Sequence, residues 1–184
     1  MSQFARYLLS LSQINNLGEG KKVEWLFHCG MLFLSKKKWW GDFQFRLTAH
    51  EGIDITYFRT HPFETRCFND HTKVPAMDDG LILNICNDFL GQTLVVDHKT
   101  RAASKRKILY VYAHIIPDVT IKVGQLIRKN EIIARVCNTW KNPLLPPHLH
   151  FSCFDVPRQI QGEHLNWNLF SKNPDAHPIN PVFL

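Results

Sequence analysis

Three short segments of the chain carry histidine and aspartate side chains at spacings that suit metal binding. They are HEGID at 50–54, YAH at 112–114 and HLHF at 148–151. Two imidazoles and one carboxylate form the ligand set of a catalytic zinc site, which leaves a fourth position for water. The segments therefore predict a catalytic centre that binds one Zn²⁺ ion.

The HLHF segment is predicted to be a strand in which both histidines share a face. Successive side chains of a strand point to opposite faces, so His148 and His150 lie on one face while Leu149 and Phe151 lie on the other. The apolar pair can then pack into a core while both imidazoles face a cleft. The same alternation turns Cys153 away from a metal at His150, which excludes Cys153 as a ligand.

The HEGID segment places a histidine and an aspartate four residues apart. Gly52 permits a tight or left-handed backbone between them, so His50 and Asp54 can converge on one ion. Each segment alone is a weak signal, because a lone histidine is more often an ordinary surface or core residue. The combination in this chain order, with His114 at the end of a strand between the other two segments, is much more specific.

Short strands must position these residues. Segments rich in β-branched, aromatic or leucine residues alternate with turn residues such as DDG at 78–80 and ND at 87–88. The predicted strands span 81–86, 93–97, 108–113, 131–136 and 149–154. Their spacing predicts a mainly β fold, a compact antiparallel β-sheet domain arranged as an open sandwich or barrel.

The two ends of the chain are predicted to differ from this β region. Apolar residues recur at helical spacing over 3–14 and predict a short N-terminal helix. The proline-containing tail from residue 173 is expected to run as an irregular strap. We therefore divide the chain into an N-terminal helix and lead-in segment at 1–40 and a main domain with its C-terminal strap at 41–184.

The composition indicates the kind of partner that the protein could bind but does not identify a single one. The 184 residues suit one domain, and a net charge of +6 favours an anionic partner such as nucleic acid, membrane or a cell-wall polymer. We find no recognition helix and no repeated aromatic-basic pattern, so we expect no nucleic-acid partner. The five cysteines include no Cys-x-x-Cys pair and leave the redox compartment open.

The N-terminal sequence indicates neither a signal peptide nor a membrane span. Ser10 and Ser12 break the first apolar run, and no small-residue cleavage site follows. The longest apolar stretch, at 23–34, contains Glu24 and His28 and is too short to cross a bilayer, so we expect no transmembrane segment.

Beyond these spacings, the sequence resembles a known family from about residue 45 to about residue 154. The similar motifs are HEGIDI at 50–55, VPAMDDGLILNI at 74–85, GQTLVVDH at 91–98, LYVYAHI at 109–115, IKVGQLIRKNEIIARVCNT at 121–139 and PPHLHF at 146–151. They resemble the lysostaphin-type, or LytM-like, zinc endopeptidases, which cut peptide bridges in bacterial cell walls. This resemblance implies an antiparallel β domain with a groove across the metal, peptidoglycan peptides as substrate and a location in the cell envelope, periplasmic or extracellular.

The resemblance also implies a role for each site residue. His50, Asp54 and His150 fall on the positions of the zinc ligands. His148 falls on the position of the general base, and His114 on that of the second catalytic histidine, which hydrogen-bonds the developing oxyanion or holds the water.

Other residues are expected to support a ligand or to line the groove. Glu51 lies inside the metal motif and is expected to contact a ligand. Tyr112 is expected to share a strand face with His114 and to line the groove. Trp140 is expected to form an apolar groove wall, in a stretch bulkier than the glycine-rich one usual in the family. The helix at 3–14 or the Trp39-Trp40 region could cover the groove.

Several functions fit this pattern. The main prediction is a zinc endopeptidase acting on a cross-bridge or a stem peptide of peptidoglycan. The alternatives are a non-catalytic cell-wall-binding or hydrolase-activating module on the same fold, and another zinc hydrolase such as a carboxypeptidase or an amidase. The bond that is cleaved and the oligomeric state stay open.

Overall fold

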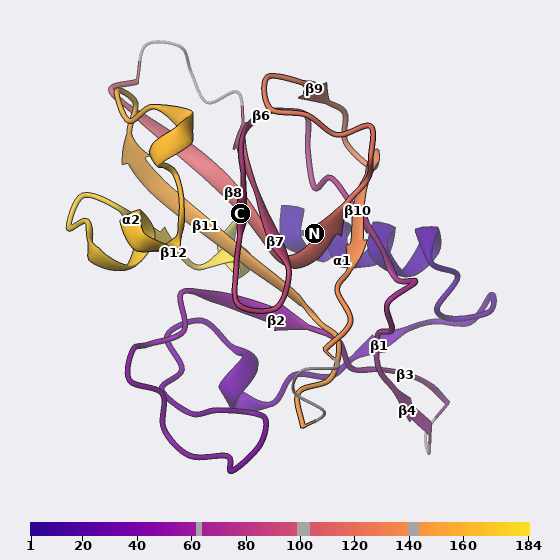
Figure 1. Cartoon of the computed structure of the whole chain (residues 1–184). Helices are drawn as coiled ribbons and strands as arrows, with labels where there is room; N and C mark the ends of the chain where they lie inside the picture. Colours follow the sequence, from indigo (N-terminus) through magenta and orange to yellow (C-terminus); the bar gives the residue numbers. More distant parts are fainter. Residues whose placement is uncertain (62–63, 99–103, 140–143) are drawn as a thin grey trace.

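A sheet of antiparallel strands forms the centre of the protein in the computed structural model, which describes residues 1–61, 64–98, 104–139 and 144–184 (Figure 1). Within these residues the sheet has nine strands. They are β2 (Gly52–Ile55), β5 (Lys73–Pro75), β6 (Gly80–Asn87), β7 (Gln92–His98), β8 (Arg106–Pro117), β9 (Leu126–Ile127), β10 (Ile132–Val136), β11 (Leu149–Pro157) and β12 (His177–Ile179). The prediction of a mainly β, antiparallel fold is therefore confirmed, and each of the five predicted strands is present.

The strand order is β12-β11-β8-β7-β6-β9, and β2 pairs with β11 beside β12. β10 pairs with both β5 and the end of β8. A separate small sheet contains β1 (Glu24–Trp25), β3 (Phe58–His61) and β4 (Glu64–Arg66). The pairing of β2 with β11 is decisive for function, because it joins the segment at 50–54 to the segment at 148–151.

Alternating side chains of the main sheet pack into two cores. Tyr110 and Tyr112 of β8 pack with Phe151 of β11 in the α1-side core, which is built around the helix α1 (Gln3–Ile14). Val111 and Phe154 point to the opposite face and pack in the α2-side core, next to α2 (Trp167–Lys172). The strict period of two along β8 and β11 separates these two sets of side chains.

The N-terminal helix is present as predicted, and it is part of the fold. Ser2 caps it by accepting a hydrogen bond from the Ala5 N–H, and Phe4, Tyr7 and Leu11 are buried in the α1-side core. This core lies on the face of β11 opposite His150. The suggestion that the helix covers the groove was therefore wrong, because its apolar side is used to close the core behind the sheet.

The C-terminal tail is more regular than the expected strap. β12 extends the edge of β11 beyond β2, with Pro178 opposite Phe154 on a strand that has no further neighbour in the described sheet. An edge strand tolerates proline because one side of it needs no N–H donor. The short helix η3 (Pro181–Phe183) follows, and the Gln3 N–H donates to the Leu184 carbonyl oxygen at 2.7 Å.

None of the helices in the described ranges is both long and apolar enough to cross a membrane.

Candidate metal centre and active site

His50, Asp54 and His150 converge on one point where β2 meets β11. His50 Nε2 lies 3.1 Å from Asp54 Oδ1 and 3.0 Å from His150 Nδ1. His150 Nδ1 lies 2.8 Å from the same Asp54 oxygen, and all three side chains are buried. Among the residues that the structure describes, this is the one group of His, Cys, Asp and Glu side chains whose donor atoms could hold a metal ion together.

The outer hydrogen bonds of the two imidazoles leave lone pairs on their inner nitrogens. His50 Nδ1 can only donate to the Leu32 carbonyl oxygen, 3.2 Å away, so His50 Nε2 carries a lone pair. His150 Nε2 lies 2.7 Å from Ser152 Oγ and 3.6 Å from Glu51 Oε1, which favours a proton on Nε2 and a lone pair on Nδ1. Two lone pairs and a carboxylate oxygen repel one another unless a cation lies between them, so this donor set fits a zinc ion.

Asp54 directs one oxygen to this point because its other oxygen is held from behind. Trp39 Nε1 donates to Asp54 Oδ2 at 2.6 Å, and Arg46 Nη2 lies 3.4 Å from the same oxygen. Burial opposes ionisation, yet the two imidazoles, which direct protons towards Asp54 when no cation is bound, hold the pKa of the Asp54 carboxyl well below its usual range. The carboxylate is therefore charged and oriented for a cation.

Gly52 is required for space between β2 and β11. Asp54 lies opposite His150 in the register, and Gly52 lies opposite Ser152. A Cβ atom at residue 52 would lie 2.3 Å from Ser152 Oγ and 2.9 Å from His150 Nε2. The strand is extended there, without a positive φ. The expectation of a tight or left-handed backbone at Gly52 was therefore wrong, and the close approach of β11 is the physical reason for the glycine.

His148 lies directly before β11 and presents a nitrogen lone pair to the same point. Its Nδ1 lies 2.9 Å from the Pro146 carbonyl oxygen, which fixes the proton on Nδ1 and the lone pair on Nε2. The Nε2 atom lies 3.9 Å from Asp54 Oδ1. Burial lowers the pKa of His148 to about 3, although the negative charge of Asp54 acts in the opposite direction. The ring is therefore neutral near pH 7.

His114 reaches this site through an unusual backbone conformation. Its φ is +62°, in the left-handed region that residues other than glycine rarely adopt. The centre of its ring lies 4.9 Å from that of His148 and 5.6 Å from that of His150. Asp88 holds this arrangement, because the His114 N–H donates to Asp88 Oδ2 at 2.9 Å and His114 Nδ1 lies 3.1 Å from Asp88 Oδ1. Only Nε2 of His114 is left for the site.

Asp88 is a functional candidate that the sequence reasoning missed. Its carboxylate also accepts hydrogen bonds from the N–H groups of Leu90 and Gly91, at 2.8 and 2.7 Å, and from the Thr93 hydroxyl at 2.9 Å. Burial opposes its ionisation, but the hydrogen bonds from His114 hold the pKa of Asp88 well below its usual range. In the sequence, an aspartate after a strand indicated only a turn.

Tyr112 does not line the site, so the expectation that it shares a face with His114 was wrong. Its side chain is fully buried in the α1-side core, where its hydroxyl accepts a hydrogen bond from the Met77 N–H at 2.9 Å. Strict alternation would place residues 112 and 114 on one face. The positive φ of His114 turns its ring to the other face, where His150 lies.

Asp54, His150 and both further histidines line a pocket of about 520 Å³. Glu51 lies in its wall, and Trp167 of α2 packs edge-on against His150 with ring centres 5.5 Å apart. The Trp39-Trp40 region was considered as a cover for the groove, but its two residues have different positions. Trp39 donates a hydrogen bond to Asp54 from behind, and Trp40 lines the pocket. Trp140, the predicted groove wall, lies outside the described residues. The remaining lining residues are Arg46, Asn87, Asp88, Phe89, Leu145 and Ser171.

Several bacterial proteins of known structure are similar to this chain. The catalytic domain of the antimicrobial peptidase lysostaphin from Staphylococcus simulans has a TM-score of 0.49 and 15% identity, over 89% of this chain and 92% of that one. A zinc containing peptidase from Vibrio cholerae has a TM-score of 0.47 and 22% identity, over 79% of this chain and 37% of that one. Csd3 of Helicobacter pylori has a TM-score of 0.46 and 20% identity, over 77% of this chain and 32% of that one. The chain thus spans about a third of the last two proteins.

At the level of sequence, no curated protein matches the chain. Residues 48–174, however, match the model of peptidase family M23. This range contains all three proposed zinc ligands and both further histidines, and it confirms the resemblance drawn from the motifs. The chain belongs to peptidase family M23.

Proposed function

We propose that the protein is a zinc-dependent endopeptidase that hydrolyses peptide bonds in bacterial peptidoglycan, in a cross-bridge or a stem peptide. One observation carries the proposal: lone-pair donors of His50, Asp54 and His150 converge on one point in a pocket that also holds two further histidines. Membership of family M23 supports peptidase activity.

The proposed metal is one zinc ion, held by His50, Asp54 and His150. When bound, it would polarise the scissile carbonyl as a Lewis acid and lower the pKa of a bound water from 15.7 towards about 7. The chain itself keeps the three donors in place, through the Leu32 carbonyl behind His50, the Trp39 indole behind Asp54 and the Ser152 hydroxyl beside His150.

The two further histidines divide the proton chemistry between them. His148 accepts the proton of the attacking water at Nε2, because its own Nδ1 proton is committed to the Pro146 carbonyl oxygen. His114 keeps its Nδ1 hydrogen bond to Asp88 and directs Nε2 into the pocket, where it hydrogen-bonds the oxyanion that develops on the substrate or holds the water. His114 and His148 are thus the proposed catalytic residues, and Asp88 is a positioning residue.

The proposal includes the organisation and location of the chain. Residues 41–184 form the peptidase domain, which contains the whole family match at 48–174. Residues 1–40 form the helix and lead-in, which contributes Trp39 to the zinc site. The proposed substrate places the protein in the cell envelope, either periplasmic or extracellular.

Mass spectrometry of digested peptidoglycan tests this function. We expect the zinc-loaded protein to release peptide fragments with new amino and carboxyl termini inside a cross-bridge or stem, and His148→Ala to release none. Binding of peptidoglycan without hydrolysis would support the non-catalytic binding or activating module instead. Release of intact stem peptides from the glycan would identify an amidase and overturn the endopeptidase assignment.

A further inference from the structure

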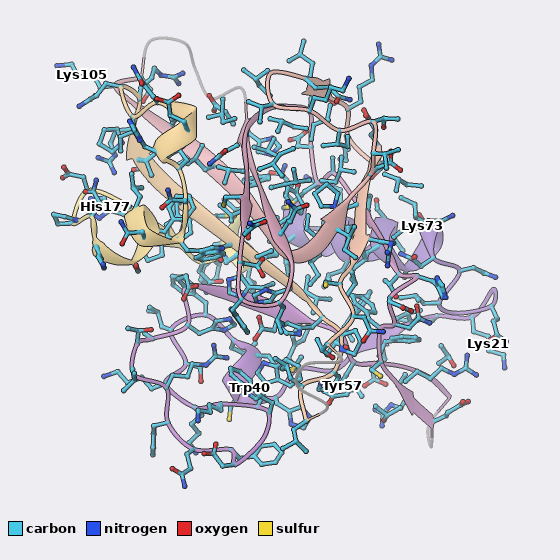
Figure 2. All side chains as sticks on the ribbon, viewed as in Figure 1. Lys21, Trp40, Tyr57, Lys73, Lys105 and His177 are labelled. Atoms are coloured by element: carbon cyan, nitrogen blue, oxygen red, sulfur yellow. The ribbon has the colours of Figure 1, made fainter. Side chains whose placement is uncertain are left out.

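A hairpin beside the pocket carries an unusual exposed surface. The Lys38 N–H donates to the Gln44 carbonyl oxygen and the Arg46 N–H to the Lys36 carbonyl oxygen, each at 2.7 Å. We call residues 34–47 the apolar-basic hairpin. It lies at the bottom of the view in Figure 1, and Figure 2 labels Trp40 within it. Because Trp40 and Arg46 also line the pocket, the hairpin surface adjoins the pocket entrance.

Large apolar side chains of this hairpin are exposed to solvent. Leu34 is 59% exposed, Phe43 65%, Phe45 71% and Leu47 107%. Single exposed apolar residues are ordinary on a protein surface. Several within one short hairpin are not, and they suggest a surface that is covered in use.

The charge of the hairpin is positive. Lys36 and Lys37 are exposed and have no acidic partner in the described part of the chain. Lys38 forms an exposed ion pair with Asp42 at 3.2 Å, so these two charges offset each other. The surface therefore combines hydrocarbon side chains with two unbalanced positive charges.

We propose that the apolar-basic hairpin docks on an anionic lipid bilayer. The phenylalanine and leucine side chains insert readily among acyl chains. The ammonium groups of Lys36 and Lys37 then lie at the level of anionic headgroups, where each lysine strengthens binding about fivefold. Docking holds the pocket at the membrane surface, because the same hairpin forms part of the pocket wall.

Sedimentation with lipid vesicles tests the proposal and requires neither zinc nor hydrolysis. The full chain is mixed with vesicles of phosphatidylcholine alone or of equal parts phosphatidylcholine and phosphatidylglycerol. We expect binding to the anionic vesicles, weakened by salt, and little binding to the neutral ones. Phe43→Ser with Phe45→Ser should lower the partition at least about tenfold. Lys36→Glu with Lys37→Glu should lower it by a similar factor or more.

The matched control is Val119→Ser with Val123→Ser, which removes apolar side chains that are 94% and 57% exposed outside the hairpin. This control should bind anionic vesicles as the wild type does. Equal thermal unfolding of all variants excludes misfolding as the cause of a loss. The proposal is overturned if the wild type binds no anionic vesicles, if it binds purified peptidoglycan sacculi but not vesicles, or if the phenylalanine variant binds vesicles as the wild type does.

Discussion

The carboxylate of Asp88 determines how His114 faces the pocket. It accepts hydrogen bonds from both the backbone N–H and the ring Nδ1 of His114, so it fixes the strained backbone and the direction of the ring together. An asparagine has almost the same shape but carries no negative charge and has only one oxygen to accept the two hydrogen bonds from His114. The effect of Asp88 on catalysis can therefore be separated from its effect on the turn.

For Asp88→Asn we expect kcat to fall by about 10²-fold, because the donor to the oxyanion is lost or misdirected. The zinc content should be unchanged, since Asp88 touches none of the proposed ligands. Steady-state kinetics with metal analysis measure both. The matched control is Asp118→Asn, because Asp118 also caps a turn, accepting from the Thr120 N–H and hydroxyl at 2.9 and 2.7 Å. Equal losses of kcat in the two variants would contradict the role of Asp88.

His148 must be neutral to accept a proton, and burial lowers its pKa to about 3. Because this pKa is lowered, His148 stays neutral down to a lower pH than an ordinary histidine does. A zinc-loaded enzyme should therefore keep its single-turnover rate within about twofold between pH 7 and pH 5.5. With an ordinary histidine pKa near 6.5, the rate would fall about tenfold over this interval. Such a fall with zinc still bound would contradict the assignment. His148→Ala should keep zinc and lose about 10²–10⁴ in rate.

Tyr112 and Tyr7 form a matched pair for testing whether the Tyr112 hydroxyl stabilises the core or acts in the groove. The Tyr112 hydroxyl satisfies the buried Met77 N–H, whereas the buried Tyr7 hydroxyl has no hydrogen-bond partner among the described residues. Tyr112→Phe should lower the free energy of unfolding by about 1–3 kcal/mol, and Tyr7→Phe should not lower it. Urea unfolding measures this, and kcat/KM should be unchanged for both variants. A raised KM for Tyr112→Phe at unchanged stability would instead indicate that Tyr112 lines the groove and contacts the substrate.

At the scale of elements, the lead-in segment is part of the metal centre although it precedes the family match. The match begins at residue 48, yet Trp39 donates to Asp54 and the Leu32 carbonyl oxygen accepts from His50. These contacts depend on the folding of residues 28–47 around β2. The conformation of this segment should therefore set the affinity for zinc as well as the shape of the pocket.

For Trp39→Phe we expect the affinity for zinc to fall about 10–100-fold, because an aromatic side chain remains while the N–H donor to Asp54 Oδ2 is removed. Competition with a chelator measures the affinity. Trp40→Phe is the matched control, since Trp40 stacks on the Arg46 guanidinium at 4.6 Å and makes no described hydrogen bond to a ligand. Unchanged zinc affinity in Trp39→Phe would show that the indole does not orient the carboxylate.

The elements with a clear period were predictable, and their irregularities were not. Alternation predicted that His148 and His150 share a cleft and that Cys153 faces away, and the structure places Cys153 in the α1-side core. The same rule failed for Tyr112 because a single positive φ at His114 reverses the direction of its ring. The roles of three other residues could not be predicted, because they depend on non-local contacts that leave no periodic pattern in the sequence. These residues are Trp39, Arg46 and Asp88.

At the scale of the whole molecule, the sheet separates structure from chemistry. The α1-side core closes one face with the N-terminal helix, while the pocket, α2 and the apolar-basic hairpin lie towards the other. The helix and the strands of the sheet followed from local sequence patterns. The face of the sheet that the helix covers could not be predicted from these patterns. It depends on how Phe4, Tyr7 and Leu11 fit the side chains of a sheet formed by distant segments.

Zinc analysis of the purified protein tests the central claim most directly, namely that His50, Asp54 and His150 share one ion. Elemental analysis by mass spectrometry should find about one zinc per wild-type chain after equilibration with the metal. Asp54→Ala should hold almost none under the same conditions, because its loss leaves two ligands and removes the only negative charge among them. A wild-type protein without zinc, or an Asp54→Ala variant that binds zinc as tightly as the wild type, would contradict the claim.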